Sequence, residues 1–205
     1  MKLQKRISAG DLSVSCAEDL AEQAESVINK LVELDRRGPR LQAGTKIRFG
    51  WSAFVIRLAG EALSVCEPDF KGDPFRDYVP WIDVTLRVLI EQSRLLAQTR
   101  VQGVDSYFDD KIVLQKGALT MKRIYLERKP VTHPNDSGWY IGSADDAHRS
   151  EDLESLYSFQ LVSKRMELLR VLALPLNYLV VFDGNRIESI LNEKNQQIFN
   201  GSLNK

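Results

Sequence analysis

The sequence predicts an α+β protein made of two small halves, each a mostly antiparallel sheet covered by one or two helices. Two observations predict this class. Segments in which apolar residues recur at every third or fourth position alternate with short β-branched and aromatic runs bounded by glycine or proline. A polar stretch at 103–110 divides these segments, so residues 1–102 and 103–205 are expected to form separate domains.

The composition is that of an ordinary globular protein, with 43% hydrophobic and 27% charged residues. The 28 basic and 28 acidic residues cancel, which removes any global argument for direct binding of nucleic acid or membrane. No apolar run approaches the roughly 18 to 20 residues of a membrane-spanning helix, and the amino-terminal residues do not resemble a secretory signal. We therefore expect a cytoplasmic monomer or weak homodimer. Cys16 and Cys66 match no metal-ligand spacing and are expected to be buried thiols.

The first half is expected to begin with a polar segment, followed by one amphipathic helix. Apolar residues recur at three- and four-residue steps from Leu20 to Leu34. Arg36 and Arg37 place cations in the last turn, and Pro39 prevents the helix from continuing. These arginines are therefore expected to mark a helix end rather than a binding patch.

A three-stranded meander is predicted over residues 45–67, where β-branched and aromatic runs are separated by glycines at Gly50 and Gly60. Residues 67–80 hold three of the seven prolines and are expected to be a loop along the sheet edge. Helical spacing resumes over 81–101. This predicts a second long helix that can cover the meander.

The second half is expected to start with strands and continue with a helix. Strands are predicted at 112–114, 119–128 and 139–142 from their β-branched and aromatic residues. Residues 151–166 carry apolar side chains at helical spacing, which predicts a helix. A short helical turn at 167–173 should follow and stop before the next proline.

A hairpin is predicted near the end of the sequence. The apolar runs 178–182 and 187–191 flank Asp183 and Gly184, an Asp-Gly pair typical of a type I′ turn. The residues from 195 to 205 are polar and are expected to be frayed.

The stretch 134–146 combines turn-forming residues, adjacent aromatics and paired acids more closely than any other part of the sequence. Four turn formers precede the strand that begins at Trp139. Because side chains alternate along a strand, Trp139 and Ile141 should share one face and Tyr140 should lie on the other. We expect the function to be organised around this stretch.

Two neighbouring segments of the second half carry opposite charge. The basic segment, residues 111–130, holds six Lys or Arg and one Glu, a formal charge of +5; the acidic segment, residues 133–160, holds six acids and one Arg, a formal charge of −5. An exposed aromatic beside an acidic loop is expected of a protein that steers toward a basic partner. The candidate partner-binding residues are Asp136, Trp139, Tyr140, Asp145, Asp146, His148, Glu151 and Asp152.

The sequence offers less support for catalysis. Ser137 lacks the glycine pattern of a nucleophile elbow, Cys16 lacks a compelling histidine partner, and glycine-rich phosphate loops are absent. We therefore expect neither catalytic residues nor a cofactor. The nearest approach to a metal site is the pair His133 and His148 flanking Asp145 and Asp146. This leaves as an alternative a metal-dependent hydrolase that uses Asp145, Asp146 and His148, with His133 as a further candidate ligand.

Four short elements then occur in order along the second half: Asp136-Ser137-Gly138-Trp139, Ser143-Ala144-Asp145-Asp146, Leu156-Tyr157 and Leu172-Ala173-Leu174-Pro175. Over roughly 114–191 the sequence resembles immunity proteins of bacterial polymorphic-toxin and type VI secretion systems that carry the Asp-Ser-Gly-Trp domain of the immunity protein 33-like kind. It departs from that pattern at Ala144 and Asn177, where glycine is usual.

The resemblance implies a non-enzymatic protein that binds one cognate toxin and blocks its active site or its assembly. A nuclease toxin would suit an acidic loop, because its phosphate-binding cleft must be basic. A non-catalytic adaptor subunit is the remaining alternative.

Overall fold

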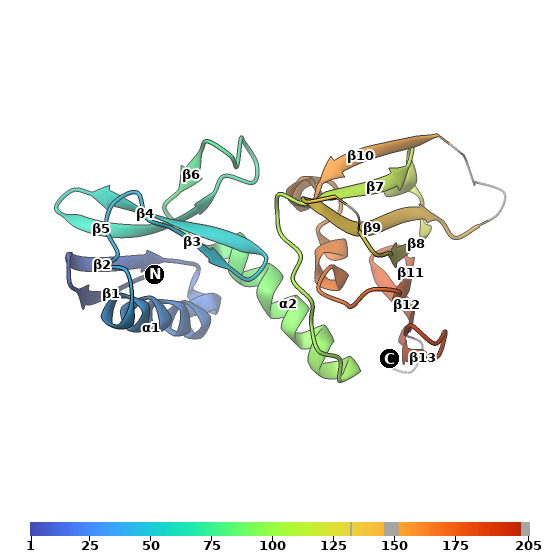
Figure 1. The fold of residues 1–205 in the computed structure, drawn as a ribbon, viewed down its shortest axis with the longest axis horizontal. Coiled ribbons are helices and arrows are strands. Elements are labelled where there is room, and N and C mark those ends of the chain that lie inside the picture. Colours follow the sequence, from blue (N-terminus) through green and yellow to red (C-terminus); the bar gives the residue numbers. More distant parts are fainter. Residues whose placement is uncertain (132, 146–151, 202–205) are drawn as a thin grey trace. The chain divides into compact units, whose positions relative to one another are not determined.

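The computed structural model describes residues 1–131, 133–145 and 152–201, and it confirms the α+β class (Figure 1). The chain divides into two compact units, Met1–Ile90 and Glu91–Lys205. The division falls within helix α2 (Asp83–Thr99). The boundary expected after residue 102 stays a prediction, for which an experiment is given below.

The first unit contains one sheet and α1. Its strands run in the order β1-β2-β5-β4-β3, with β6 paired to β5, and β2 and β5 are parallel while the other pairs are antiparallel. The elements of this unit that precede α2 are β1 (Lys2–Ile7), β2 (Gly10–Ser15), η1 (Glu18–Leu20), α1 (Ala21–Arg37), β3 (Lys46–Phe49), β4 (Ser52–Ala59), β5 (Ala62–Pro68) and β6 (Tyr78–Val79).

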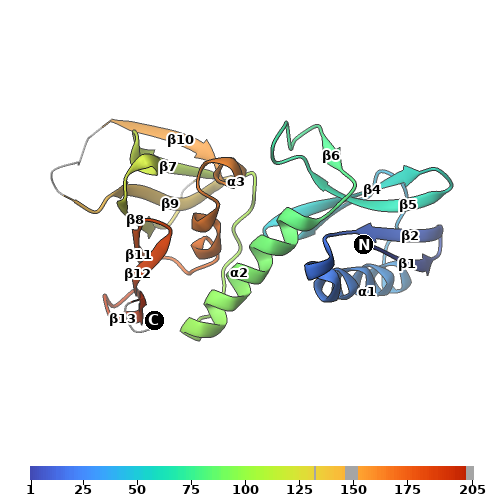
Figure 2. The same cartoon turned by 180° about the vertical axis from the view of Figure 1, so that it is seen from behind.

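The core of the first unit lies between α1 and the sheet, as Figure 2 shows from behind. The helix contributes residues at three- and four-residue steps, and the strands contribute alternate residues, so each element buries one face. The predicted helix and meander are confirmed. The residues that meet in this core include Ala24, Val27, Ile28 and Leu31 from α1, and Leu12, Val14, Phe54, Ile56 and Val65 from the sheet.

The expected polar lead at the amino terminus is wrong, because β1 and β2 form a hairpin there. Strand β1 is an edge strand of which only Ile7 is buried, and Leu3, two periods of the alternation earlier, is the other apolar residue that packs against the core. Two apolar residues among charged and polar ones are a weak strand signal, so this strand depends on pairing with β2. The buried thiols of Cys16 and Cys66 are as expected, and both are free.

The second unit begins within α2 and contains a seven-stranded sheet in the order β10-β7-β9-β8-β11-β12-β13. Strands β7 and β9 are parallel, and the other pairs are antiparallel. Its elements are β7 (Lys111–Gln115), η2 (Ala118–Thr120), β8 (Arg123–Arg128), β9 (Asp136–Ser143), β10 (Leu153–Tyr157), η4 (Ser158–Gln160), α3 (Leu161–Lys164), η5 (Met166–Val171), β11 (Leu179–Asp183), β12 (Arg186–Leu191) and β13 (Gln197–Asn200).

The helix predicted over 151–166 is wrong for its first part and is confirmed only for its second part. Residues Leu153–Tyr157 form the edge strand β10, which pairs with β7, and helical structure starts only after it. The apolar spacing misled because Leu153, at 60% exposure, does not belong to the core, whereas Leu156 is buried. Pairing with β7 decided the conformation of this segment.

Two smaller expectations near the carboxyl end are also corrected. Strand β13, residues 197–200, pairs with β12, so the frayed tail expected from 195 onward is wrong for these residues. The predicted hairpin of β11 and β12 is confirmed, with Gly184 and Asn185 as its two-residue loop. Only Gly184 of the two has a positive φ, 57°, which excludes the type I′ turn that needs positive φ at both positions.

Candidate functional site

The motif Asp136-Ser137-Gly138-Trp139 shapes the start of strand β9. The Asp136 carboxylate accepts a hydrogen bond from the Gly138 N–H at 2.9 Å. The Ser137 hydroxyl donates to the carbonyl oxygen of Lys111 at 2.7 Å and accepts from the Trp139 N–H at 3.1 Å. Gly138 has φ +75°, and a Cβ there would overlap the carbonyl oxygen of Lys129. These four residues therefore hold β9 in place between β7 and β8.

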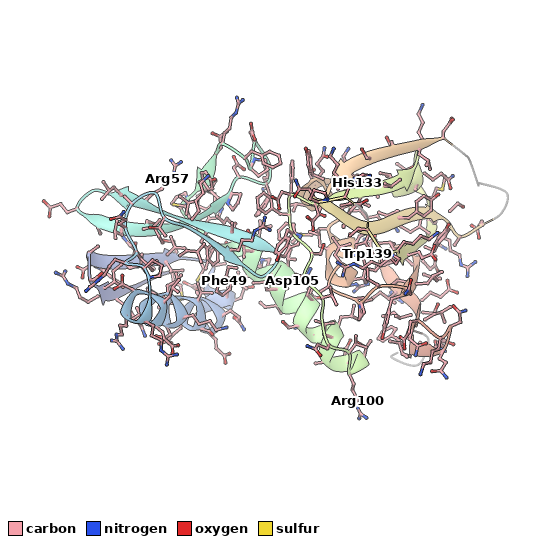
Figure 3. All side chains as sticks on the ribbon, viewed as in Figure 1. Phe49, Arg57, Arg100, Asp105, His133 and Trp139 are labelled. Atoms are coloured by element: carbon pink, nitrogen blue, oxygen red, sulfur yellow. The ribbon has the colours of Figure 1, made fainter. Side chains whose placement is uncertain are left out.

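Trp139 is a core residue of the second unit, at 1% exposure (Figure 3). Its indole N–H donates to the carbonyl oxygen of Leu172 at 3.1 Å, which ties β9 to the segment that follows η5. The predicted alternation is confirmed, since Ile141 is also buried and Tyr140 is only half-buried. The exposed aromatic of this stretch is therefore Tyr140, and the Trp139 side chain is enclosed by its own domain.

Arg128 connects several segments of the same region. Its position in the basic segment did not by itself predict that it would be buried. It is 4% exposed, and its guanidinium donates to five backbone carbonyl oxygens, those of Val104, Asp105, Ser137, Leu172 and Leu174, at 2.6 to 3.3 Å. Burial lowers the pKa of Arg128, and the nearby carboxylates of Asp110 and Asp105 oppose that shift.

The strand period contained a signal for this residue. Arg128 is in phase with the buried Ile124 and Leu126, which indicates an inward-facing guanidinium.

The outward face of β8 and β9 carries a pair of tyrosines. The ring centroids of Tyr125 and Tyr140 are 5.8 Å apart, and both rings lie over Gly142, where a Cβ would come within 2.9 Å of each. Both side chains are half-buried. Glycine at position 142 therefore allows an aromatic patch on this face, which we call the tyrosine patch (Tyr125, Tyr140 and Gly142).

Arg123 of the basic segment is neutralised in part by two acids, of which Asp145 belongs to the acidic segment and Glu188 to strand β12 of the same sheet. Arg123 donates from Nε and Nη2 to the Glu188 carboxylate, at 2.9 Å each, and its Nη1 lies 3.5 Å from Asp145. Bonding to Glu188 raises the pKa of Arg123, and the same bonds lower the pKa of Glu188. The Asp145 side chain remains 47% exposed, so it can still contribute to an acidic surface.

The other candidate residues are placed as follows. Asp136 is half-buried at the start of β9, and Asp152 is exposed just before β10, where its carbonyl oxygen accepts from the Lys116 N–H at 2.9 Å. Asp146, His148 and Glu151 lie outside the described residues.

A metal site does not emerge from the part of the chain that the structure describes, where no group of three or more His, Cys, Asp or Glu is arranged to hold an ion. The hydrolase alternative depends on Asp146 and His148, outside that part. Among the described helices, none is long and apolar enough to cross a membrane.

Comparison with known proteins gives one family. A model of the Imm33-like domain matches residues 91–193, which is half of the chain and most of the second unit. No curated protein and no solved structure matches the sequence. The matched span contains the Asp136–Trp139 motif, Arg128 and the tyrosine patch, and it confirms the resemblance found from the sequence. The protein belongs to the family of Imm33-like domains.

Proposed function

We propose that the protein is a cytoplasmic immunity protein, which binds one cognate secreted toxin and neutralises it without catalysis of its own. Family membership supports the immunity role. The surface that best fits such a partner is the outward face of β8 and β9. When bound, this face would cover the toxin's active site or a surface that the toxin needs for assembly.

The tyrosine patch is the observation that carries this choice. Tyrosine is enriched at the centres of protein interfaces, because a rigid ring offers a large contact area at low cost in conformational entropy. Charged side chains border the patch, with Glu127 paired to Lys129 at 3.1 Å, and Arg123 paired to Asp145 and Glu188. An aromatic centre with a charged rim has the composition expected of a specific interface.

Acidic residues near Asp145 in the sequence are suited to attract a basic partner. Asp145 leads into the sequence that carries Asp146, Glu151 and Asp152. A toxin with a basic cleft, such as a nuclease, would be attracted by these carboxylates and would associate faster at low salt. The proposal therefore assigns steering to the acids and affinity to the tyrosines.

The first experiment is co-expression with the product of the adjacent toxin gene, followed by purification and a toxicity assay. A stable complex that abolishes toxicity supports the proposal. A complex that leaves toxicity intact indicates an adaptor, and no complex with no protection contradicts the immunity role.

Charge reversal then tests the surface. Asp145→Lys with Asp146→Lys should slow association with the toxin by about tenfold or more and weaken its salt dependence. Asp183→Lys is the matched control, because Asp183 is also about half-exposed and ion-paired in the same sheet, at 3.3 Å from Lys122. Equal association rates for the double variant and the control would show that the acids do not face the toxin.

Replacement of Tyr140 tests the patch itself. Tyr140→Ala should raise the dissociation rate by about tenfold to a hundredfold, the effect of losing an interface anchor, whereas Tyr140→Phe should keep most of the affinity. An unchanged dissociation rate in Tyr140→Ala would place the interface elsewhere.

A further inference from the structure

The second unit contains a cavity of about 510 Å³ that is separate from the tyrosine patch. It is lined by the carboxyl-terminal part of α2, by η5 and by the β12–β13 end of the sheet. Three arginines from three different elements converge on it, Arg94, Arg170 and Arg186, and the lining contains a single acid, Glu91. The cavity therefore carries an excess of positive charge.

Arg170 makes two contacts that orient its guanidinium at this cavity. Its Nη2 donates to the carbonyl oxygen of Asn185 at 2.9 Å, and its guanidinium carbon lies 5.4 Å from the ring centroid of Phe182. Its Nε is buried and has no hydrogen-bond partner among the described residues. A buried charged donor without an acceptor is unfavourable, because it has lost its water and gained no bond in exchange.

The other two arginines of the lining are exposed to solvent. Arg186 is exposed at the start of β12. Arg94 is 61% exposed and pairs with Glu91 three residues earlier on α2. Guanidinium groups bind carboxylate and phosphate oxygens through parallel N–H bonds, so arginines on several sides favour an oxyanion.

Apolar side chains complete the lining. Leu95 and Ile187 are buried there, and Phe199 from β13 adds an aromatic ring. The volume lies in the range of small-molecule sites and exceeds what a bare inorganic ion would fill. The lining therefore offers contacts for an organic body as well as for an anionic group.

We propose that this cavity binds a small organic oxyanion, a phosphate ester or a carboxylate, whose charged group bonds to Arg170 and Arg186 and whose apolar part lies against Leu95 and Phe199. The site does not use the tyrosine patch or the acidic residues, so it stands independently of the toxin-binding proposal. Burial lowers the pKa of Arg170 because it disfavours the charged guanidinium, and a bound anion would offset that cost.

The test follows the arginine Nε–H resonances of the full-length protein by NMR during titration with pyrophosphate, and separately with citrate, at constant ionic strength maintained with chloride. One or both anions should shift the Arg170 resonance saturably, with a Kd of about 1 mM or tighter. Preference for pyrophosphate would identify a phosphate ligand, and preference for citrate a carboxylate. No saturable shift from either anion up to about 10 mM would overturn the proposal.

Variants separate a built site from general attraction to positive charge. Arg186→Gln should weaken anion binding at least about tenfold, because it removes a charge-assisted hydrogen bond. The control is Lys194→Gln, which removes the same charge from an exposed position of the same unit outside the cavity lining, and it should change the affinity less than about twofold. Equal losses in the two variants would show nonspecific ion attraction and would also overturn the proposal.

Discussion

Replacing Gly138 by alanine tests whether the Asp-Ser-Gly-Trp motif is primarily a structural device. Gly138 has φ +75°, where an alanine side chain costs about 1 to 2 kcal/mol. Its Cβ would also overlap the Lys129 carbonyl oxygen and lie 3.0 Å from a methyl group of Val131. To relieve that overlap, the backbone at Lys129 must move away from Gly138. This movement weakens the hydrogen bond that the Lys129 N–H donates to the Gly138 carbonyl oxygen at 2.8 Å.

The expected loss of stability follows from these terms. Overpacking typically costs about 1 to 3 kcal/mol and a weakened hydrogen bond about 1 kcal/mol, in addition to the backbone strain. Gly138→Ala should therefore lower the free energy of unfolding of the second unit by about 3 to 6 kcal/mol. That is a large part of the roughly 5 to 15 kcal/mol that stabilises a typical domain.

Gly117→Ala is the matched control. Gly117 has φ +80°, and nothing lies within 4 Å of a Cβ at that position, so only the backbone cost of about 1 to 2 kcal/mol applies. Urea unfolding should be followed through the indole N–H resonance of Trp139, which reports on the second unit because it bonds to Leu172. If the two variants agree within about 0.5 kcal/mol, the close approach of Lys129 does not determine the choice of glycine.

Three further predictions concern stability. Burial raises the pKa of Glu67 to about 7 despite N–H bonds from Val84 and Thr85, so the folded state retains a proton that the unfolded state releases above its ordinary pKa. The free energy of unfolding should thus fall by about 3 kcal/mol between about pH 4.5 and 7 relative to Glu67→Gln, and a rise with pH would contradict this. Arg128→Lys should destabilise the second unit by at least about 3 kcal/mol in urea unfolding, because lysine cannot bond to all five carbonyl oxygens. The control Arg123→Lys should cost about 1 kcal/mol or less, because the ion pairs of Arg123 are partly exposed. Similar losses in the two variants would show that the bonds from Arg128 to the carbonyl oxygens do not stabilise the unit. For the boundary expected after residue 102, fragments 91–205 and 103–205 should be compared by denaturation. The longer should be more stable by about 2 to 4 kcal/mol because it retains buried Leu95 and the 2.9 Å bond from Gln92 to the Leu169 carbonyl, whereas equal midpoints would favour the boundary after 102.

Local patterns in the sequence were sufficient for the elements that bury one continuous face. The helix α1, the meander of β3 to β5 and the helix α2 all follow from residue spacing and from glycine and proline positions. The alternation that buries Trp139 and exposes part of Tyr140 was predictable for the same reason, since the strand period is a local property.

Edge strands could not be predicted from local patterns. Strands β1 and β10 each bury a single residue, and each depends on a neighbouring strand that supplies its hydrogen-bond partners. In β10 the three-residue spacing of Leu153 and Leu156 fits one face of a helix, whereas in the strand these side chains lie on opposite faces, one exposed and one buried, so local spacing favoured the wrong structure.

The sequence by itself determined the fold class, the main helices, the family and the presence of opposed charge blocks. Only the tertiary structure decided which charges pair with each other, as Arg123 does with Glu188, and which charge is buried, as at Arg128. It also brought Arg94, Arg170 and Arg186 to one cavity from distant positions in the chain. The physical reason is that periodicity reports on the environment of one element, whereas ion pairs, buried donors and cavities are created by contacts between elements far apart in sequence.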